Sequence, residues 1–273
     1  MKRTQLLPFV EIKGIGAASG LVLHQHSLYI ISDNSTYLYQ YNLADKELHK
    51  IKLLATSAEH LSKKEKADFE CVTLYNNALY IHGSGSTNKR QLRLKYTLDT
   101  LETKEKDLTK LYHRLRKSIG IEEDDLNIEG CIVVEDFYYF FQRGNGGQAK
   151  NGIFTYARHT KEVRFQSVVL PEIKGIEATF TDAILVDDCV YFLAACEDTT
   201  STYNDGEIYG SFMGCLDLAT STVLFTCLLS DLHKFEGLTL YKNEGESLTF
   251  LLCEDNDTED DSSTIYEVIL TNA

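Results

Sequence analysis

The sequence has no tryptophan, only two prolines, and no long run of hydrophobic or basic residues. The missing tryptophan argues against WD40 and kelch arrays, whose blade signatures use that residue. No stretch approaches the length of a membrane-spanning helix, and residues 1–14 lack the apolar core of a signal peptide. We therefore expect no membrane partner and a cytoplasmic location. With a net charge of -14 and no Lys/Arg run, the chain also predicts no nucleic-acid partner.

Other familiar signatures are missing as well. The seven cysteines form no CxxC pair and no Cys/His cluster with zinc-ligand spacing. Most lie in apolar, strand-like runs, as expected for buried thiols in a reducing compartment. There is neither a P-loop nor a Gly-x-Ser-x-Gly elbow, and we expect no organic cofactor. The 273 residues, 43% of them apolar, suffice for one large domain or two small ones.

The chain does contain a recurring sequence motif: an apolar residue, Glu, a small residue and then an apolar run. The copies are residues 68–72, 127–131, 175–178 and 234–238, and a degenerate fifth at 17–22 has Ser19 in place of Glu. The anchor positions are 19, 70, 129, 177 and 236, so successive copies are 51, 59, 48 and 59 residues apart. Such spacings suit a four-stranded antiparallel unit with its loops.

Each copy is followed by further short runs of β-branched and aromatic residues, separated by turn residues. The last copy lacks a fourth strand, whereas an extra strand at residues 5–12 precedes the first copy. A ring closed by pairing that N-terminal strand into the last blade satisfies both facts and removes exposed sheet edges. The sequence thus predicts an all-β, five-bladed β-propeller, a single domain over residues 1–273. A pair of β-sandwiches is the alternative, but it would not explain the spaced Glu.

Two segments depart from the strand pattern. Residues 57–66 begin with a possible N-cap, Ser57, and predict a short helix. Residues 106–119 place apolar side chains at helical spacing and predict an amphipathic helix. Both connect neighbouring blades, where they could pack as simple connections or form a partial lid.

The recurrent Glu marks the start of the innermost strand of a blade, so these side chains should converge at one mouth of the central channel. The predicted set is Glu70, Glu129, Glu177 and Glu236. In the fourth blade, matching residues 12–15 to residues 173–176 puts Asp182 opposite Ser19 instead of Glu177. Carboxylates so close together need raised pKa values, basic partners or a cation, and Ca²⁺ or Mg²⁺ takes oxygen ligands. Alternatively, each carboxylate accepts backbone N–H groups and locks neighbouring blades.

The ends of the second strands should reach the same mouth. Together with Ser19, they supply the candidate ligand-binding residues Asp33, Asn34, His82, Lys89, Arg90, Arg143, Asn145, Asp198 and Glu254. Basic residues flank Gly-rich turns in the second and third blades, a combination that suits phosphate or carboxylate groups. We therefore expect a small anionic ligand or a protein partner at the loop face. His82 is the one candidate base near neutral pH.

Three segments resemble the blade motif of the esterase-like phytase and SdiA-regulated propellers. They are Ala18-Ser19-Gly20-Leu21, residues 28–33 and Phe235-Glu236-Gly237-Leu238. Residues 83–90 resemble a related family of uncharacterised bacterial propellers. The resemblance implies acidic metal ligands at a channel mouth, with phosphoester or lactone hydrolysis. The chain departs from the pattern in having five copies rather than six, no export signal and few basic residues.

Two functions follow from these observations. The first is a non-catalytic propeller that binds a small ligand or a partner, with a divalent cation at the acidic mouth. The second is a metal-dependent hydrolase in which the carboxylates hold the cation, Arg143 orients an anionic substrate, and His82 or a free carboxylate acts as base.

Overall fold

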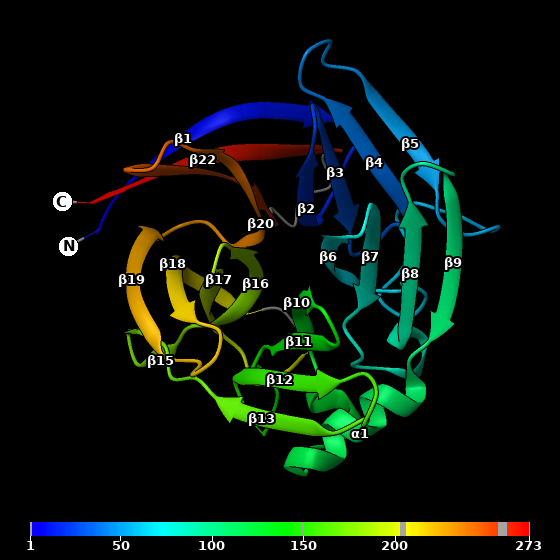
Figure 1. The fold of residues 1–273 in the computed structure, drawn as a ribbon, viewed down its shortest axis with the longest axis vertical. Helices are drawn as coiled ribbons and strands as arrows, with labels where there is room; N and C mark the ends of the chain where they lie inside the picture. The colour runs from blue at the N-terminus through cyan, green and yellow to red at the C-terminus, as the bar shows by residue number, and fades with distance from the viewer. Residues whose placement is uncertain (1, 149, 203–205, 256–260, 273) are drawn as a thin grey trace.

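The computed structural model describes residues 2–148, 150–202, 206–255 and 261–272. Five four-stranded antiparallel sheets surround a central channel, which confirms the five-bladed propeller (Figure 1). The innermost strands of the blades are β2 (Ala18–His24), β6 (Phe69–Tyr75), β10 (Ile128–Val134), β16 (Thr179–Val186) and β20 (Phe235–Asn243). The second strands are β3 (Ser27–Ser32), β7 (Ala78–Gly83), β11 (Phe137–Gln142), β17 (Cys189–Asp198) and β21 (Ser247–Glu254).

The two outer positions of each blade follow in the same order. The third strands are β4 (Tyr37–Asn42), β8 (Leu92–Thr97), β12 (Gly152–Ala157), β18 (Glu207–Asp217) and β22 (Ser262–Asn272). The outermost strands are β5 (Leu48–Lys52), β9 (Glu102–Asp107), β13 (Val163–Ser167), β19 (Val223–Ser230) and, in the fifth blade, β1 (Lys2–Lys13). A further small hairpin, β14 (Glu172–Ile173) with β15 (Ile176–Glu177), precedes the fourth blade.

The predicted closure by the N-terminal strand is confirmed. Strand β1 pairs with β22 in antiparallel register from Lys2 opposite Asn272 to Lys13 opposite Ser262, with one irregularity between Pro8 and Val10. Figure 1 shows these two strands side by side, with both chain ends at one edge of the ring. The N-terminal strand β1 thus supplies the fourth strand of the last blade.

Five hydrophobic clusters hold the ring together, one between each pair of neighbouring blades. They form because strand residues alternate between two faces, so each sheet presents apolar side chains to both neighbours. Tyrosine, phenylalanine, leucine and isoleucine fill these clusters in place of tryptophan. All seven cysteines are free, and five of them are buried in this packing.

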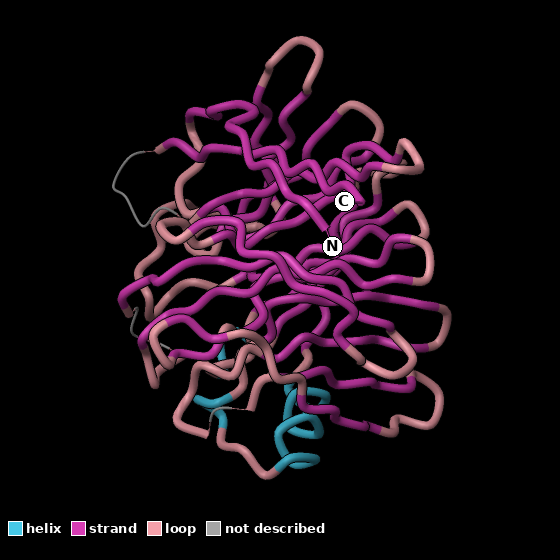
Figure 2. Tube along the Cα trace, turned by 90° about the vertical axis from the view of Figure 1, so that its left-hand side faces the viewer, coloured by secondary structure: helices cyan, strands magenta, loops and turns pink. Residues whose placement is uncertain are grey.

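One of the two predicted helices is present. Helix α1 (Thr109–Ile119) begins three residues later than predicted, because residues 106 and 107 complete β9. It lies at the outer edge of the ring between the second and third blades, and its Tyr112 and Leu115 join the cluster there. Two single-turn 3-10 helices, η1 (Asn88–Arg90) and η2 (Glu123–Asp125), lie at the same end of the molecule (Figure 2). No helix in the described ranges is long and apolar enough to cross a membrane.

The helix predicted for residues 57–66 is wrong; this segment consists of turns. The Ser57 hydroxyl donates to the carbonyls of Thr36 and Leu54 instead of capping a helix. The backbone of Ala58 and Leu61 pairs with residues 36 and 34, which draws the segment along the mouth of the first blade. These tertiary hydrogen bonds replace the local ones that a helix would need.

Candidate functional site

A β-bulge marks the start of the innermost strand in every blade. The bulged residue is Ser19, Glu70, Glu129, Thr181 or Glu236 in the five blades. A bulge inserts one unpaired residue and re-aims its side chain. The repeated sequence motif therefore corresponds to a repeated β-bulge. Three of its five copies direct a carboxylate toward the channel mouth.

The fourth copy is Phe180-Thr181-Asp182 rather than residues 175–178, which corrects the predicted anchor from 177 to 181. Glu177 lies in the small β14–β15 hairpin, is exposed, and accepts a hydrogen bond from the backbone N–H of Leu170. It takes no part in the carboxylate ring. The corrected anchors are separated by 51, 59, 52 and 55 residues, which is more even than the predicted spacing.

Ser19, Thr181 and Asp182 connect blades instead of lining the mouth. The Ser19 hydroxyl donates to the carbonyl of Phe69 at 2.5 Å, and the Thr181 hydroxyl donates to that of Phe235 at 2.6 Å. Asp182 accepts the backbone N–H groups of Ala183 and Leu238. Its burial nevertheless raises the pKa of this carboxyl well above its usual range. Of these three side chains, only Asp182 acts as the alternative prediction describes, as a carboxylate that accepts backbone N–H groups and connects neighbouring blades.

The channel mouth itself is a polar cavity of about 70 Å³. One water molecule needs roughly 10–15 Å³ on the same measure, so the cavity admits a small ion with its hydration shell or a small polar molecule. Seven carboxylates and five cationic side chains line it. They are Asp33, Asp68, Glu70, Glu129, Glu197, Glu236 and Asp255, with Lys63, Lys66, Arg90, Arg143 and Lys234.

Most of these charges neutralise one another in buried ion pairs. Lys66 Nζ lies 2.8 Å from Asp68 Oδ1 and also contacts Asp33. Arg90 Nη1 lies 2.7 Å from Asp68 Oδ2. Burial alone would lower the pKa of Lys66, but the charges of Asp68 and Asp33 raise it.

On the opposite side of the mouth, Arg143 contacts Glu129 at 3.2 Å and also Glu197. Lys234 lies 2.8 Å from Glu236 and 3.2 Å from Asp255. The basic residues thus serve as internal counter-ions for the acidic ones.

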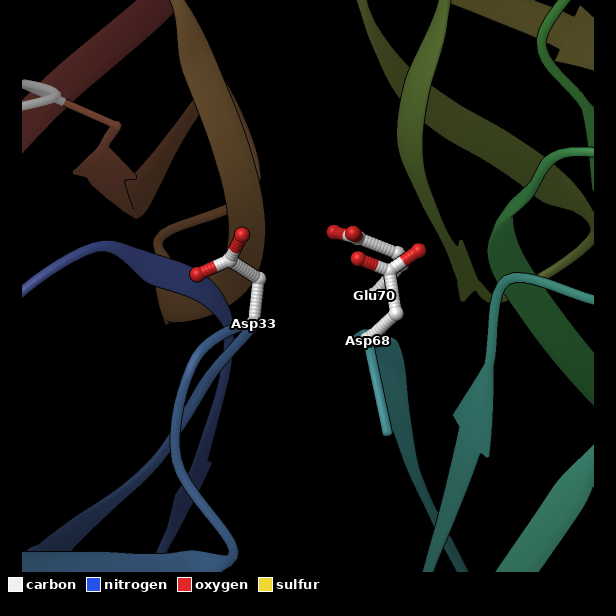
Figure 3. A group of neighbouring side chains, drawn as sticks. All are labelled: Asp33, Asp68 and Glu70. Atoms are coloured by element: carbon white, nitrogen blue, oxygen red, sulfur yellow. The ribbon is translucent and has the colours of Figure 1, made fainter. Parts of the chain in front are cut away.

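Glu70 is the exception among the buried carboxylates of the mouth. Its side chain is 9% exposed, and within the described residues it has no hydrogen-bond donor or ion-pair partner. Figure 3 shows its carboxylate directed into the channel beside Asp68, facing Asp33 across the gap. One oxygen from each of these three residues lies within 4.8 Å of the others. Burial, followed by the charges of Asp68 and Glu129, raises the pKa of Glu70 well above its usual range.

Seven of the predicted site residues do meet at this mouth. They are Asp33, Glu70, Arg90, Glu129, Arg143, Asn145 and Glu236. Asn34, Lys89, Asp198 and Glu254 lie outside its lining, and Lys89 and Asp198 are exposed. The ends of the second strands do reach the mouth, but through the neighbouring residues. Glu197 and Asp255, each one position away from the predicted Asp198 and Glu254, line the cavity.

His82 is wrongly predicted as a residue of the mouth. It lies in another cavity, between the second and third blades, where it makes edge-on contacts with the rings of Tyr138 and Phe140. The ring is 1% exposed, and burial lowers its pKa to about 3. His82 therefore does not supply a general base at the channel mouth.

Sequence reasoning missed Asp68, Asn127 and Lys234, although a signal for them was present. Each stands two positions before the repeated Glu, and alternate residues of a strand point to the same face. Asn127 Nδ2 indeed donates to Glu129 Oε1 at 2.6 Å. Lys66 could not be found in this way, because it belongs to the irregular connection that was predicted to be a helix.

The solved structures that the chain is similar to are distant in sequence. The Malassezia sympodialis allergen Mala s 1 is 9% identical with a TM-score of 0.58, and the match covers 96% of each chain. A nidogen/laminin complex is 12% identical with a TM-score of 0.49, covering 92% of this chain and 89% of the other. At these identities the likeness concerns the fold alone.

No functionally curated protein matches the sequence. The resemblance to esterase-like phytase and SdiA-regulated propellers stays a prediction beyond the propeller itself. Residues 14–270 match the model of a family of unknown function, DUF6929, and the chain belongs to that family.

Proposed function

We propose that this protein is a binding propeller whose channel mouth takes a small ligand with a positive charge, a hard divalent cation such as Ca²⁺ or Mg²⁺ in the simplest case. The observation that carries the proposal is Glu70, a buried carboxylate without a donor that is directed into the cavity. An unpaired buried charge is costly unless a counter-charge reaches it. A bound cation would supply that counter-charge.

Neighbouring atoms support the same ligand class. Asp33 Oδ1 and Glu129 Oε2 are buried and have no hydrogen-bond partner among the described residues. Arg143 Nε is the one unpartnered donor among the buried side-chain atoms of the described lining. The unsatisfied groups of the mouth are thus mainly carboxylate oxygens, which are the ligands that Ca²⁺ and Mg²⁺ prefer.

A small anion, which the sequence predicted, has less support here. Lys66, Arg90, Arg143 and Lys234 are already paired with carboxylates. An anion would have to compete with these internal partners. A cation, in contrast, would compete with Lys66, whose ammonium group contacts Asp33 and Asp68 beside Glu70, and with Arg90 at Asp68.

Thermal melting of chelator-treated protein, with and without Ca²⁺, Mg²⁺ or Mn²⁺, tests the proposal. A ligand present at 100 times its Kd stabilises the folded state by about 2.7 kcal/mol, so the wild type should melt at higher temperature with at least one ion. Glu70→Gln should lose this shift. Glu177→Gln is the matched control, because Glu177 lies outside the mouth, and its shift should equal that of the wild type. Unchanged melting of the wild type with all three ions would contradict a metal site.

Lys66 gives the experiment a second arm. Because its ammonium group contacts two of the three carboxylates, Lys66→Met should tighten cation binding while lowering the stability of the ion-free protein. Weaker cation binding in Lys66→Met than in the wild type would indicate that Lys66 supports the ligand rather than competing with it, and would count against the proposal.

A metal-dependent hydrolase is the second candidate function, and one observation supports it. Glu129 is 2% exposed, and its Oε2 lacks a partner in the same cavity, where a general base would be needed. A screen of phosphoester and lactone substrates with the metal-loaded protein tests it. Hydrolysis by the wild type that exceeds that of Glu129→Gln by at least tenfold would support the enzyme; equal rates would leave binding as the function.

A further inference from the structure

A second cavity lies between the second and third blades, away from the channel mouth. It has a volume of about 220 Å³, and a neighbouring hollow of about 480 Å³ shares five of its lining residues. We call the two together the basic cleft. Its cationic lining residues are Arg93, Lys95, Lys106, Lys110, Arg114, Arg158 and Lys161, and its aromatic ones are Tyr80, Tyr138, Phe140 and Tyr156.

These cations differ from those of the channel mouth in lacking carboxylate partners. Within the described residues, none of the seven forms a salt bridge, although the chain carries a net charge of -14. The one carboxylate in the lining, Asp107, accepts the backbone N–H of Thr109 at the start of α1. His159, at the rim, contacts Asp136 at 3.0 Å.

Strand register adds to the repulsion. Arg93 of β8 stands directly opposite Lys106 of β9, and Lys95 stands opposite Lys104. Like charges in directly opposed positions destabilise a sheet. In an acidic protein, two adjacent pairs of this kind on one blade are unfavourable unless an anion lies between them.

Aromatic rings hold three of these cations without neutralising them, and one is Lys95, whose Nζ lies 5.7 Å from the ring centre of Tyr80. The Arg93 guanidinium lies 5.1 Å from the ring centre of Tyr80 and donates to the Tyr138 hydroxyl at 3.2 Å. Arg158 lies 5.6 Å from the ring centre of Tyr138. Such contacts orient guanidinium groups while their charge stays available. Arg93 Nε is buried and has no hydrogen-bond partner.

His82 lies in the lining of the same cleft. Its ring is 1% exposed, and Nδ1 has no hydrogen-bond partner in the part of the chain that the structure describes. A buried polar atom that stays unsatisfied destabilises the folded protein. An oxygen atom of a ligand that entered between Arg93 and Lys106 would offer His82 the missing partner.

We propose that the basic cleft binds a small phosphate-bearing anion. Guanidinium groups match phosphate oxygens in geometry, and lysines add charge. The aromatic walls leave room for a planar group attached to the phosphate. The cleft is bounded by two blades and by Leu108 and Leu111 next to and within α1, and its volume is that of a small-molecule site rather than a track for a polymer.

Titration calorimetry at low salt with inorganic pyrophosphate tests this proposal, and a nucleoside diphosphate forms a second arm. The wild type should bind pyrophosphate, and Arg93→Met and Lys106→Met should each weaken binding at least tenfold. Lys161→Met, at an exposed turn, keeps the test valid if Arg93→Met fails to fold. Lys52→Met is the matched control: it removes an exposed lysine from the outermost strand of the first blade and should bind like the wild type. Tighter binding of the nucleoside diphosphate would show that the aromatic walls contact its base.

Three results would overturn the proposal. They are no pyrophosphate binding at millimolar concentration, equal binding by Lys106→Met and Lys52→Met, and binding of a single-stranded oligonucleotide at these residues without binding of pyrophosphate. Because none of the substitutions touches the channel mouth, loss of cation binding there would leave the outcome at the basic cleft unchanged.

Discussion

At the scale of single residues, Glu70 is held in a position where its charge is unfavourable. Among the described residues it has no donor, and burial, together with the nearby carboxylates, raises its pKa. A folded-state pKa above the ordinary 4.5 means that the folded protein binds this proton more tightly than the unfolded chain. Without a ligand, stability therefore falls as the pH rises from about 4.5 through the folded-state pKa.

Glu70→Gln should accordingly stabilise the ligand-free protein at pH 7 by roughly 1–3 kcal/mol, the cost of an unsatisfied buried group. The gain should disappear below about pH 4, where the wild-type carboxyl is protonated in both states. Urea unfolding at pH 7 and pH 4 measures both quantities. Glu129→Gln is the contrasting variant and should destabilise, because it weakens a buried pair with Arg143. A less stable Glu70→Gln at pH 7 would show that Glu70 is ionised and compensated.

His82 gives a prediction of opposite sign. Its folded-state pKa of about 3 lies below the ordinary 6.5, so the unfolded chain gains a proton first as the pH falls. Wild-type stability should decrease from pH 6.5 toward pH 3 by up to about 1.4 kcal/mol per pH unit from this residue. His82→Phe should remove that part of the slope, as measured by urea unfolding between pH 7 and pH 4. Identical slopes in the two proteins would contradict a buried neutral imidazole.

At the scale of elements, hydroxyl groups at the bulges link one blade to the next. The Thr181 hydroxyl donates to the carbonyl of Phe235 in the adjacent blade, and both groups are buried. Thr181→Val preserves the shape but leaves that carbonyl without this donor, so we expect a loss of about 1–3 kcal/mol in the free energy of unfolding. Thr155→Val, on the third strand of the third blade, should change it by less than about 0.5 kcal/mol. Equal effects of the two substitutions would argue against the link.

The sequence allowed most elements to be predicted, because strand alternation and the repeated Glu are local signals. The fourth blade was misaligned by four residues, since Thr181 replaces Glu there and a Glu by coincidence occurs in the preceding hairpin. Residues 57–66 were misjudged because their backbone pairs with a loop far along the chain. His82 was misplaced because strand alternation turns it into the cavity between the second and third blades, whereas Arg90, further along the same connection, lines the mouth.

Site prediction was limited for a related reason. Individual carboxylates of the mouth could be predicted from the repeat, but the cationic side chains that neutralise them could not. Lys234 neutralises Glu236 from two positions earlier in the chain, whereas Arg143 reaches Glu197 from the third blade to the fourth. The Arg143–Glu197 pair depends on a distance between blades that no single segment encodes.

At the scale of the whole molecule, one pairing of strands closes the ring. Gln5 of β1 stands opposite Ile269 of β22. A disulfide formed in Gln5→Cys/Ile269→Cys would join residues near the two ends of the chain. The loop-entropy model predicts about 5–6 kcal/mol of stabilisation for a loop closed between residues 5 and 269. Thermal melting of the oxidised protein and of the same protein under reducing conditions measures the effect. A lower melting temperature after oxidation would mean that the closure cannot accommodate the bond.

The closure by β1 also determines the order in which the protein can be completed during translation. Among the strands of this propeller, β1 leaves the ribosome first and its partner β22 leaves last. Throughout synthesis the first strand has no partner, and an unpaired strand is a template for contacts with other nascent chains. The fifth blade therefore cannot finish folding before β22 has left the ribosome. The strand pair that closes the finished ring thus leaves β1 unpaired for nearly the whole time that the propeller is being made.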